Sequence, residues 1–399
     1  MSFSTVNNDN VLLNNQPIME AISKFVQGLI EAMLNEQFSV FINRQPYERK
    51  VQKVKLSRNG YRYRNYMFIW SKMLRIKIPR CREAAFSPGL KSGGKQMDKE
   101  LERMLIQIWL EGGSYRDIQV LVKRIYGERF SIGTFSRIVR VADKYVKQFH
   151  QRKINHFYDS VYIDGLSISI KGFPRQYDEY LRKKKKNAVF LGVLGQRKEE
   201  KKIIREMIDF KISQVEDFEN YRLLLESLKS RGLKFTIAVH DGEESISKAL
   251  KWTYGKVPQQ LCLVHKMRNI LDCLIHKHYK EPLRREIWNV YSSPSLGKFI
   301  SRKKSLIRKW RNIEPDAIRL FAKNEKRLLS KYYVEHIYHK HIGTNNPIER
   351  YFREIRRRSK VIGCFENIQS ADSLLFLIVD YLNQRRGSSP FSIDLDFTH

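Results

Sequence analysis

Three acidic residues stand where a carboxylate could do chemistry. Asp164 lies inside the apolar run "SVYIDGLSISI", Asp241 directly follows the apolar run "FTIAVH", and Glu349 begins the basic segment "ERYFREIRRR". Mg²⁺ is bound by a few carboxylates and completes its coordination with water and phosphate oxygens. Two such ions about 4 Å apart can activate a water or a 3′-hydroxyl and stabilise the leaving oxygen of a phosphodiester. The three acids are therefore candidate ligands of a two-metal site.

Two of these acids also have structural explanations. An ionised Asp164 within an apolar strand is unfavourable unless it is paired, protonated or bound to a cation, but it could lie on a solvated strand end. Gly165 beside it indicates a bulge or a close backbone approach. Asp241 could be the N-cap of the helix predicted in "GEESISKALKWTYG", or it could be a ligand just beyond the carboxyl end of a strand.

Glu349 has a structural alternative as well. With Asn346 as N-cap and Pro347 at the first helical position, Glu349 would complete an arrangement like a capping box. Alternatively it is a metal ligand beside a phosphate backbone, because guanidinium groups match the geometry of phosphate. The arginines on this segment that are expected to contact DNA are Arg350, Arg353, Arg356 and Arg357.

Composition narrows the class of protein. The 399 residues include 75 Lys and Arg against 42 Asp and Glu, a formal net charge of +33, which indicates a polyanionic partner such as nucleic acid. Four scattered cysteines without a C-x-x-C pair indicate a reducing, intracellular compartment. Neither a secretion signal nor a membrane span is predicted. A protein of the cytoplasm or nucleoid is therefore expected.

The N-terminal part of the chain is expected to serve DNA binding or dimerisation. Within residues 1–95, a helical pattern covers 18–42, and alternation around the Asn59-Gly60 pair predicts a hairpin. Residues 87–95 are predicted to be a linker by their Ser, Gly and Pro content.

Residues 96–150 predict three helices in the layout of a helix-turn-helix. The second helix begins with Ser114 and Asp117, the spacing of a capping box. The third would present Arg137 and Arg140 to DNA. An ordinary three-helix subdomain is the alternative, and the basic charge of the chain favours DNA contact.

The remainder of the chain predicts a mixed α/β core. Residues 151–265 show the order strand, strand, strand, helix, strand, residues 266–340 are mainly helical, and residues 341–399 return to the core with a last helix at 368–385. The basic run 182–186 falls in a connection between the first two strands.

The chain resembles the Mutator-type transposases of bacterial and archaeal insertion sequences. The resemblance covers roughly residues 57–385, and the motifs that carry it are "YIDGLSI", "VHDGEESISKAL", "QQLCLVHKMRNIL" and "GTNNPIERYFREIRRRSKVIGCFEN". It implies an α/β fold with a ribonuclease H-like mixed sheet core and a helical insertion, preceded by the helix-turn-helix DNA-binding region. It also implies an Asp-Asp-Glu triad, here Asp164, Asp241 and Glu349, that binds Mg²⁺, for which Mn²⁺ can substitute.

The resemblance adds a C-x-x-H element, which matches Cys262 and His265. Two ligands cannot close a tetrahedral zinc site, so a structural or supporting role beside the catalytic site is favoured for both residues. The chain departs from the family at Gly165-Leu166-Ser167, where relatives often have Ala-Leu-Tyr, and at His240, where Ser is usual.

The expected function is that of a DNA transposase. It would bind the terminal inverted repeats of its element in double-stranded DNA, cleave the phosphodiester backbone and join the 3′-hydroxyl ends to target DNA. Because two ends must be brought together, a homodimer or a higher oligomer is expected. The alternatives are a non-catalytic, domesticated DNA-binding protein and a nuclease of the same fold that only hydrolyses.

Overall fold

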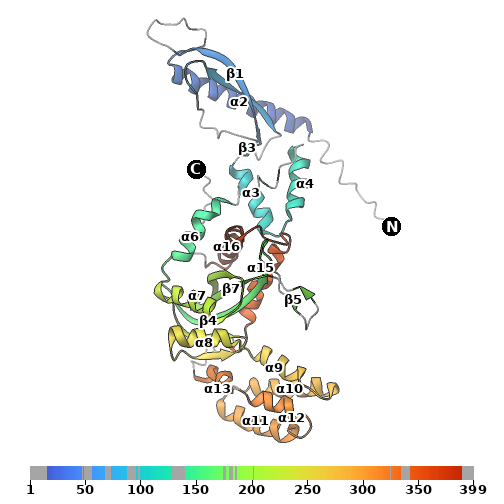
Figure 1. The fold of residues 1–399 in the computed structure, drawn as a ribbon. Coiled ribbons are helices and arrows are strands. Elements are labelled where there is room, and N and C mark those ends of the chain that lie inside the picture. Colours follow the sequence, from blue (N-terminus) through green and yellow to red (C-terminus); the bar gives the residue numbers. More distant parts are fainter. Residues whose placement is uncertain are drawn as a thin grey trace, which may run out of the picture. The chain divides into compact units, whose positions relative to one another are not determined.

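A computed structural model of the chain divides into two compact units, residues 1–139 with 395–399, and residues 140–394 (Figure 1). The two units are described separately. The structure describes residues 16–46, 48, 56–67, 73–87, 96–97, 99–126, 131, 133, 140–173, 177–178, 183–184, 187–200, 202–323, 325–333 and 342–388. The predicted linker lies almost entirely outside these residues, as do the side chains of the basic run 182–186.

The first unit begins with a long helix on a small sheet. Helix α2 (Gln16–Ile42) packs on strand β2 (Leu74–Cys81), which is antiparallel to β1 (Arg58–Met67), and the short β3 (Gln96–Met97) runs parallel to β1. This confirms the predicted helix and hairpin. The Asn59-Gly60 pair, however, lies within β1 at an irregularity of the pairing, where Gly60 has φ +65°, and does not form the hairpin turn.

Two of the three predicted helices before the core are described over their whole length. They are α3 (Lys99–Leu110) and α4 (Tyr115–Tyr126). The predicted capping box is confirmed, because the Ser114 N–H donates to Asp117 Oδ2 at 2.8 Å and the Asp117 N–H donates to Ser114 Oγ at 3.1 Å. The first part of the third predicted helix, with Arg137, lies mostly outside the described residues, and its second part is observed as a 3-10 turn (Arg140–Ala142) followed by helix α6 (Asp143–Gln151).

The second unit contains a mixed five-stranded sheet in the order β10-β9-β4-β7-β8. Strand β4 (Phe157–Ile168) is antiparallel to β7 (Ala188–Glu199), which is antiparallel to β8 (Lys202–Ser213). On its other side β4 runs parallel to β9 (Lys234–His240), which is parallel to β10 (Gln259–Leu261). Four of these strands, β4, β7, β8 and β9, lie where alternation and short apolar runs predicted them, whereas β10 was not predicted.

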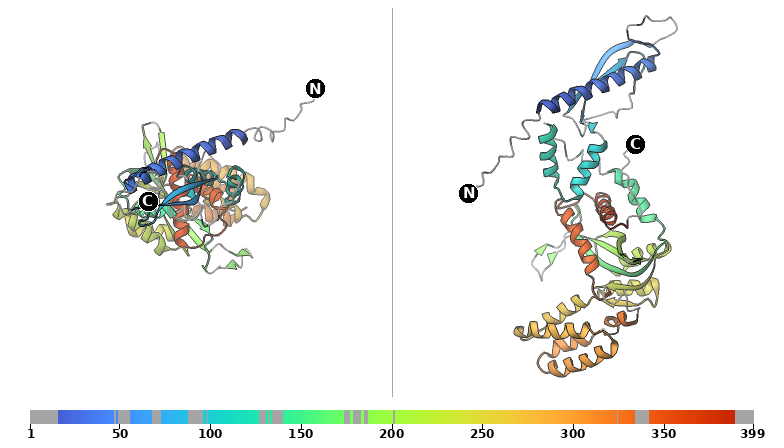
Figure 2. Two further views of the ribbon diagram at one scale, coloured as in Figure 1. Left: turned by 90° about the horizontal axis from the view of Figure 1, so that it is seen from above. Right: turned by 180° about the vertical axis from the view of Figure 1, so that it is seen from behind.

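Helices cover both faces of this sheet (Figure 2). One face packs against α7 (Phe218–Ser230) and α8 (Glu244–Tyr254), with Ile163 and Val193 of the sheet in their shared core. The opposite face packs against α15 (Asn346–Ser359) and α16 (Ile368–Arg385). There the aromatic side chains stack and meet edge to face, as in the Phe190–Phe210 and Phe190–Phe352 pairs.

A helical lobe separates β10 from α15, as the sequence predicts. Its main helices are α9 (Leu263–Asp272), α10 (Lys280–Tyr291), α11 (Leu296–Trp310) and α12 (Pro315–Ala322). The lobe has its own apolar core, which includes Ile287, Phe299, Trp310 and Phe321. Within the described part of the chain, no helix is both long and apolar enough to cross a membrane.

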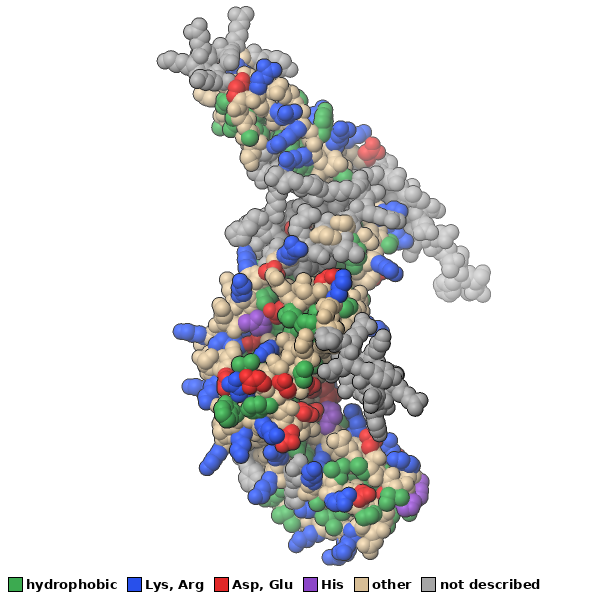
Figure 3. Space-filling model, in the orientation of Figure 1, with side chains coloured by type: hydrophobic (Ala, Val, Ile, Leu, Met, Phe, Trp, Pro, Cys, Tyr) green, Lys and Arg blue, Asp and Glu red, His purple; other side chains and the backbone are tan. Residues whose placement is uncertain are grey.

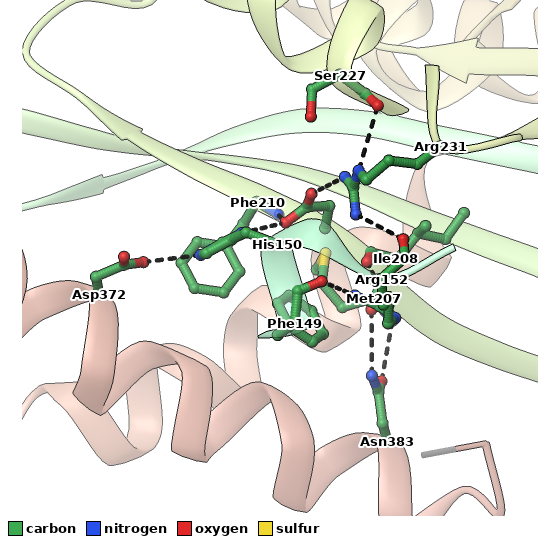
Figure 4. A network of polar contacts seen from close by, with 11 residues as sticks. Phe149, His150, Arg152, Met207, Ile208, Phe210, Ser227, Arg231, Asp372 and Asn383 are labelled. Atoms are coloured by element: carbon green, nitrogen blue, oxygen red, sulfur yellow. Dashed lines mark hydrogen bonds and ion pairs between the residues drawn. The ribbon is translucent and has the colours of Figure 1, made fainter. Parts of the chain in front are cut away.

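A buried carboxylate joins three elements of the second unit (Figure 4). Asp209 of β8 is only 2% exposed, contacts His150 Nδ1 at 2.6 Å and forms an ion pair with Arg231 at the end of α7. His150 of α6 (Asp143–Gln151) also contacts Asp372 of α16, with Nε2 3.2 Å from Oδ1. Burial alone would lower the pKa of His150, but the hydrogen bonds and charges of the two aspartates outweigh it and raise that pKa to about 9.

This network predicts a pH dependence of stability. Because the pKa of His150 is raised in the folded state, its stabilisation is complete below about pH 6.5 and is lost as the pH rises through about 9. Chemical denaturation at pH 6 and pH 9.5 should show the wild type losing on the order of 2 kcal/mol more than His150→Gln between these conditions. His156→Gln, at an exposed position, is the matched control and should follow the wild type. Equal losses in the wild type and His150→Gln would contradict the assignment.

Candidate active site

The sheet brings the first two candidate acids together. In the parallel pairing of β4 with β9, Tyr162 is opposite Val239, so the same register continued by two residues places Asp164 opposite Asp241. Neighbouring strands lie about 4.8 Å apart. Asp164 and Tyr162 alternate to the same face of β4, the face covered by α15.

The third acid is connected to the first by a buried asparagine. Asn345 immediately precedes α15 and is fully buried; its side-chain Nδ2 donates to Asp164 Oδ2 at 3.1 Å. Its carbonyl accepts the N–H of Glu349 at 3.1 Å. The first turn of α15, with Glu349 on it, is therefore fixed against the strand that carries Asp164.

The structural alternatives for Asp241 and Glu349 are wrong. Helix α8 begins at Glu244, with Glu243 rather than Asp241 at the N-cap position, and Asp241 Oδ1 instead accepts the Glu243 N–H at 2.9 Å in a tight turn. The N-cap of α15 is Asn345, not Asn346, so Glu349 lies one position further into the helix than predicted. Because the Asn345 side chain is engaged by Asp164, it makes no cap and no capping box forms.

The alternatives for Asp164 are corrected too. Asp164 lies four residues before the end of β4 and pairs regularly with Gly192 of β7, so Gly165 does not mark a bulge. The neighbour of Gly165 is a side chain, since a Cβ placed there would lie 2.5 Å from Oε1 of Glu216. The glycine thus makes room for another carboxylate next to Asp164.

Glu216 was not predicted from the sequence. It lies between β8 and α7, and its Oε1 accepts the Tyr221 hydroxyl at 2.5 Å. Burial raises the pKa of Glu216, and the charge of Asp241 adds to this effect. The available sequence signal was the Gly165 departure, because an alanine there would collide with the Glu216 carboxylate.

The electrostatics of the site favour a cation. Burial raises the pKa of Asp164 to about 8, and the negative charges of Asp241, Glu216 and Glu349 contribute in the same direction. Within the part of the chain that the structure describes, Oε1 of Glu349 and Oδ1 of Asn345 are buried without a hydrogen-bond partner. Clustered carboxylates with unsatisfied oxygens fit the ligand preference of Mg²⁺ or Mn²⁺.

Cys262 and His265 adjoin the third acid. Cys262 is fully buried and its Sγ accepts the Asn345 N–H at 3.2 Å, while His265 Nε2 lies 3.7 Å from Glu349 Oε1. His240 is also fully buried; its Nδ1 accepts the Gly242 N–H at 3.1 Å, and burial lowers its pKa to about 4. His240 is therefore neutral and stabilises the turn that follows Asp241.

Most of the predicted DNA-contacting arginines are exposed on the described elements. Arg140 is exposed at the start of the second unit, and Arg350, Arg353, Arg356 and Arg357 are exposed on α15. Arg358 is fully buried; it pairs with Glu354 at 2.6 Å and lies over the Tyr381 ring. On the face drawn in Figure 3, other Lys and Arg side chains are spread over the rest of the second unit.

A mixed sheet that brings carboxylates together beside a basic helix defines a candidate for metal-dependent chemistry on phosphodiesters. The sequence profile of the family described as "Transposase, Mutator family" matches residues 3–385. The chain belongs to this family.

Individual relatives are similar over nearly their whole length. The transposase for insertion sequence element IS1201 of Lactobacillus helveticus is 27% identical over 376 residues, 94% of this chain and 98% of the relative. The IS256 transposase in transposon Tn4001 of Staphylococcus aureus is 25% identical, over 90% of this chain and 89% of the relative. Among solved structures, the Drosophila P element transposase strand transfer complex aligns over 73% of this chain and 67% of that one, with 14% identity and a TM-score of 0.28.

The raised pKa of Asp164 predicts that this site destabilises the metal-free fold. Ionisation of Asp164 disfavours the folded state, so its contribution to stability is complete below about pH 3.8 and is lost as the pH rises through about 8. Asp164→Asn should therefore be more stable than the wild type in EDTA at pH 8, by on the order of 2 kcal/mol. An amide flip of Asn345 would let its Oδ1, which has no partner among the described residues, accept a hydrogen bond from the new NH₂ group.

The measurement is chemical denaturation of both proteins with EDTA and with Mg²⁺. Mg²⁺ should stabilise the wild type more than Asp164→Asn and so reduce the difference. Asp159→Asn, on the same strand, serves as the control and should show no stability gain. An Asp164→Asn variant less stable than the wild type at pH 8 would argue against the crowding of negative charge.

Proposed function

We propose that the chain is a DNA transposase that cleaves and joins DNA with a pair of divalent cations bound by Asp164, Asp241 and Glu349. The observation that carries the proposal is the single buried Asn345, whose side chain contacts Asp164 and whose backbone begins the helix of Glu349. The continued strand register adds Asp241. Family membership provides the reaction class.

The topology supports a ribonuclease H-like core. In chain order, three antiparallel strands (β4, β7, β8) are followed by two strands, β9 and β10, that extend the sheet in parallel from the first one. Asp164 then lies in the central strand and Asp241 just after its parallel neighbour. The helical lobe separates both from the third acid, as the resemblance implies.

The cations and the residues around them are proposed to have separate roles in the reaction. Bound Mg²⁺, or Mn²⁺ in its place, would activate a water or a 3′-hydroxyl and stabilise the leaving oxygen. Asp164 must lose its proton for the cation to bind, and Asn345 holds one of its oxygens in a fixed orientation. Glu216 adds negative charge without filling the place of a triad acid.

DNA contact would come from the basic surface. Arg350, Arg353 and Arg356 are exposed on the helix that carries Glu349, so a phosphate backbone bound by them would lie next to the acids. The helices at 99–126 and Arg140 are proposed to contact the terminal inverted repeats. Because two element ends must be joined in one reaction, the active form is proposed to be a homodimer or larger.

The central prediction concerns cleavage. Asp164→Asn, Asp241→Asn and Glu349→Gln should each abolish Mn²⁺-dependent cleavage of the element ends and strand transfer into a target plasmid, while binding to the repeats stays within about threefold. Glu244→Gln is the matched control, since this residue is exposed three positions after Asp241. A triad variant that cuts at the normal rate would overturn the assignment.

The same assay separates the alternatives. A domesticated binding protein would bind the repeats without cutting, with or without metal ions. A hydrolysis-only nuclease would cut but yield no product joined to the plasmid.

The arginines of α15 give a separate prediction. Arg353→Ala and Arg356→Ala should weaken DNA binding at low salt and reduce the slope of log K against log salt by about 1 each, because each removes a phosphate contact. The control is Arg319→Ala, an exposed arginine on α12 in the helical lobe. Unchanged salt slopes in both α15 variants would exclude this helix from the phosphate contacts.

A further inference from the structure

Cys262 and His265 have a third possible metal ligand that their sequence positions do not reveal. One ligand atom from each of Cys262, His265 and Glu349 lies within 4.8 Å of the other two. Cys262 is the N-cap of α9, His265 lies in the first turn of the same helix, and Glu349 is contributed by α15. The two helix starts therefore place sulfur, nitrogen and oxygen around one point.

The spacing approaches that of a bound ion. In a tetrahedral Zn²⁺ site, bonds of about 2.0–2.3 Å place neighbouring ligand atoms about 3.3–3.6 Å apart. His265 Nε2 and Glu349 Oε1 are 3.7 Å apart, too far for a hydrogen bond and close to the separation across such an ion. A small inward shift of the side chains would close the site.

The surroundings are those of an incomplete polar site. Glu349 Oε1, the oxygen that faces His265, is buried and has no hydrogen-bond partner among the described residues. Oδ1 of the fully buried Asn345 likewise has no partner within the described ranges, and the Asn345 N–H donates to Cys262 Sγ. Buried polar atoms are normally satisfied, so this group of unsatisfied atoms indicates a missing partner. The N–H donated to sulfur is an outer contact of the kind that orients metal ligands.

We propose that Cys262, His265 and Glu349 bind a thiophilic divalent cation such as Zn²⁺, at a position distinct from the cation pair of the triad. The donor set distinguishes the two, because a thiolate and an imidazole select Zn²⁺ or Co²⁺, whereas clustered carboxylates select Mg²⁺ or Mn²⁺. The Cys262 thiol releases its proton to solvent when the cation binds. Three protein ligands leave a fourth position for water.

The proposal has a consequence for activity, and this consequence rests on the proposed function. Glu349 is shared between the two sites, so a cation held by Cys262 and His265 engages the carboxylate that the Mg²⁺ pair requires. Zn²⁺ is therefore an inhibitor that competes with Mg²⁺ for one side chain. Binding itself does not depend on whether the protein cuts DNA.

The test uses the full chain, freed of metal and titrated with Co²⁺ as a spectroscopic probe. The wild type should bind one Co²⁺ with a thiolate-to-metal charge-transfer absorption that Zn²⁺ displaces. Cys262→Ser should lose this absorption and bind at least about 100-fold more weakly. Cys273→Ser is the matched control, an exposed cysteine at the other end of α9, and should retain it.

Two further variants keep the result interpretable. His265→Gln retains the sulfur and the buried packing of Cys262, so weaker Co²⁺ binding in this variant cannot be explained by misfolding at Cys262. Asp241→Asn should lose cleavage and keep Co²⁺ binding, which separates failure of this site from failure of the triad. The proposal is overturned if the wild type shows no thiolate absorption, if Cys262→Ser keeps it, or if Asp241→Asn removes it.

The competition is measured separately by adding Zn²⁺ to cleavage reactions at fixed Mg²⁺. Cleavage should fall over the Zn²⁺ range that displaces Co²⁺, and EDTA followed by fresh Mg²⁺ should restore it. If cleavage stays complete while Zn²⁺ occupies the Cys262–His265–Glu349 site, Zn²⁺ and Mg²⁺ do not compete for Glu349.

Discussion

The hydrogen bond from Asn345 to Asp164 is the contact on which the arrangement of the site depends. It links the residue that precedes α15 with the central strand of the sheet, and the two residues are 181 positions apart in the chain. Its geometry is stable because Asn345 is fully buried and its backbone is held from both sides, by Cys262 Sγ and by the N–H of Glu349. The amide also provides a neutral partner for a carboxylate that burial and neighbouring negative charge would otherwise destabilise.

Periodicity predicted most of the secondary structure. Strands β4, β7, β8 and β9, the helices on either side of the sheet and the helical lobe fall where apolar spacing and breakers placed them, since these signals are local. The three-residue strand β10 was not predicted. The Ser114–Asp117 capping box is confirmed for the same reason, because its two partners are three residues apart. The Asn59-Gly60 pair does not form the expected hairpin turn, because the positive φ that glycine adopts suits a bulge within a strand as well as a turn.

The contacts within the site could not be predicted in this way. Asn345 and Asn346 are adjacent and equally suited to capping, and only the tertiary partner of Asn345 decides which one precedes the helix. Glu216 is one acid among 42 Asp and Glu, and its position beside Gly165 depends on the path from β8 to α7. Glu349, the third possible ligand beside Cys262 and His265, lies 84 residues after His265 in the chain. A periodic pattern carries no information on such pairings.

The helical lobe enters and leaves the core at one point. The Leu263 N–H at the beginning of the lobe donates to the Gly343 carbonyl at its end, at 2.9 Å. This hydrogen bond brings the two ends of the lobe together at its base. Its helices pack around their own apolar core. The helices of this lobe could therefore be lengthened, shortened or replaced in evolution while the Leu263–Gly343 contact at its base is kept. The number of residues between the second and third acids would then reflect the evolutionary history of the lobe and not a requirement of the chemistry.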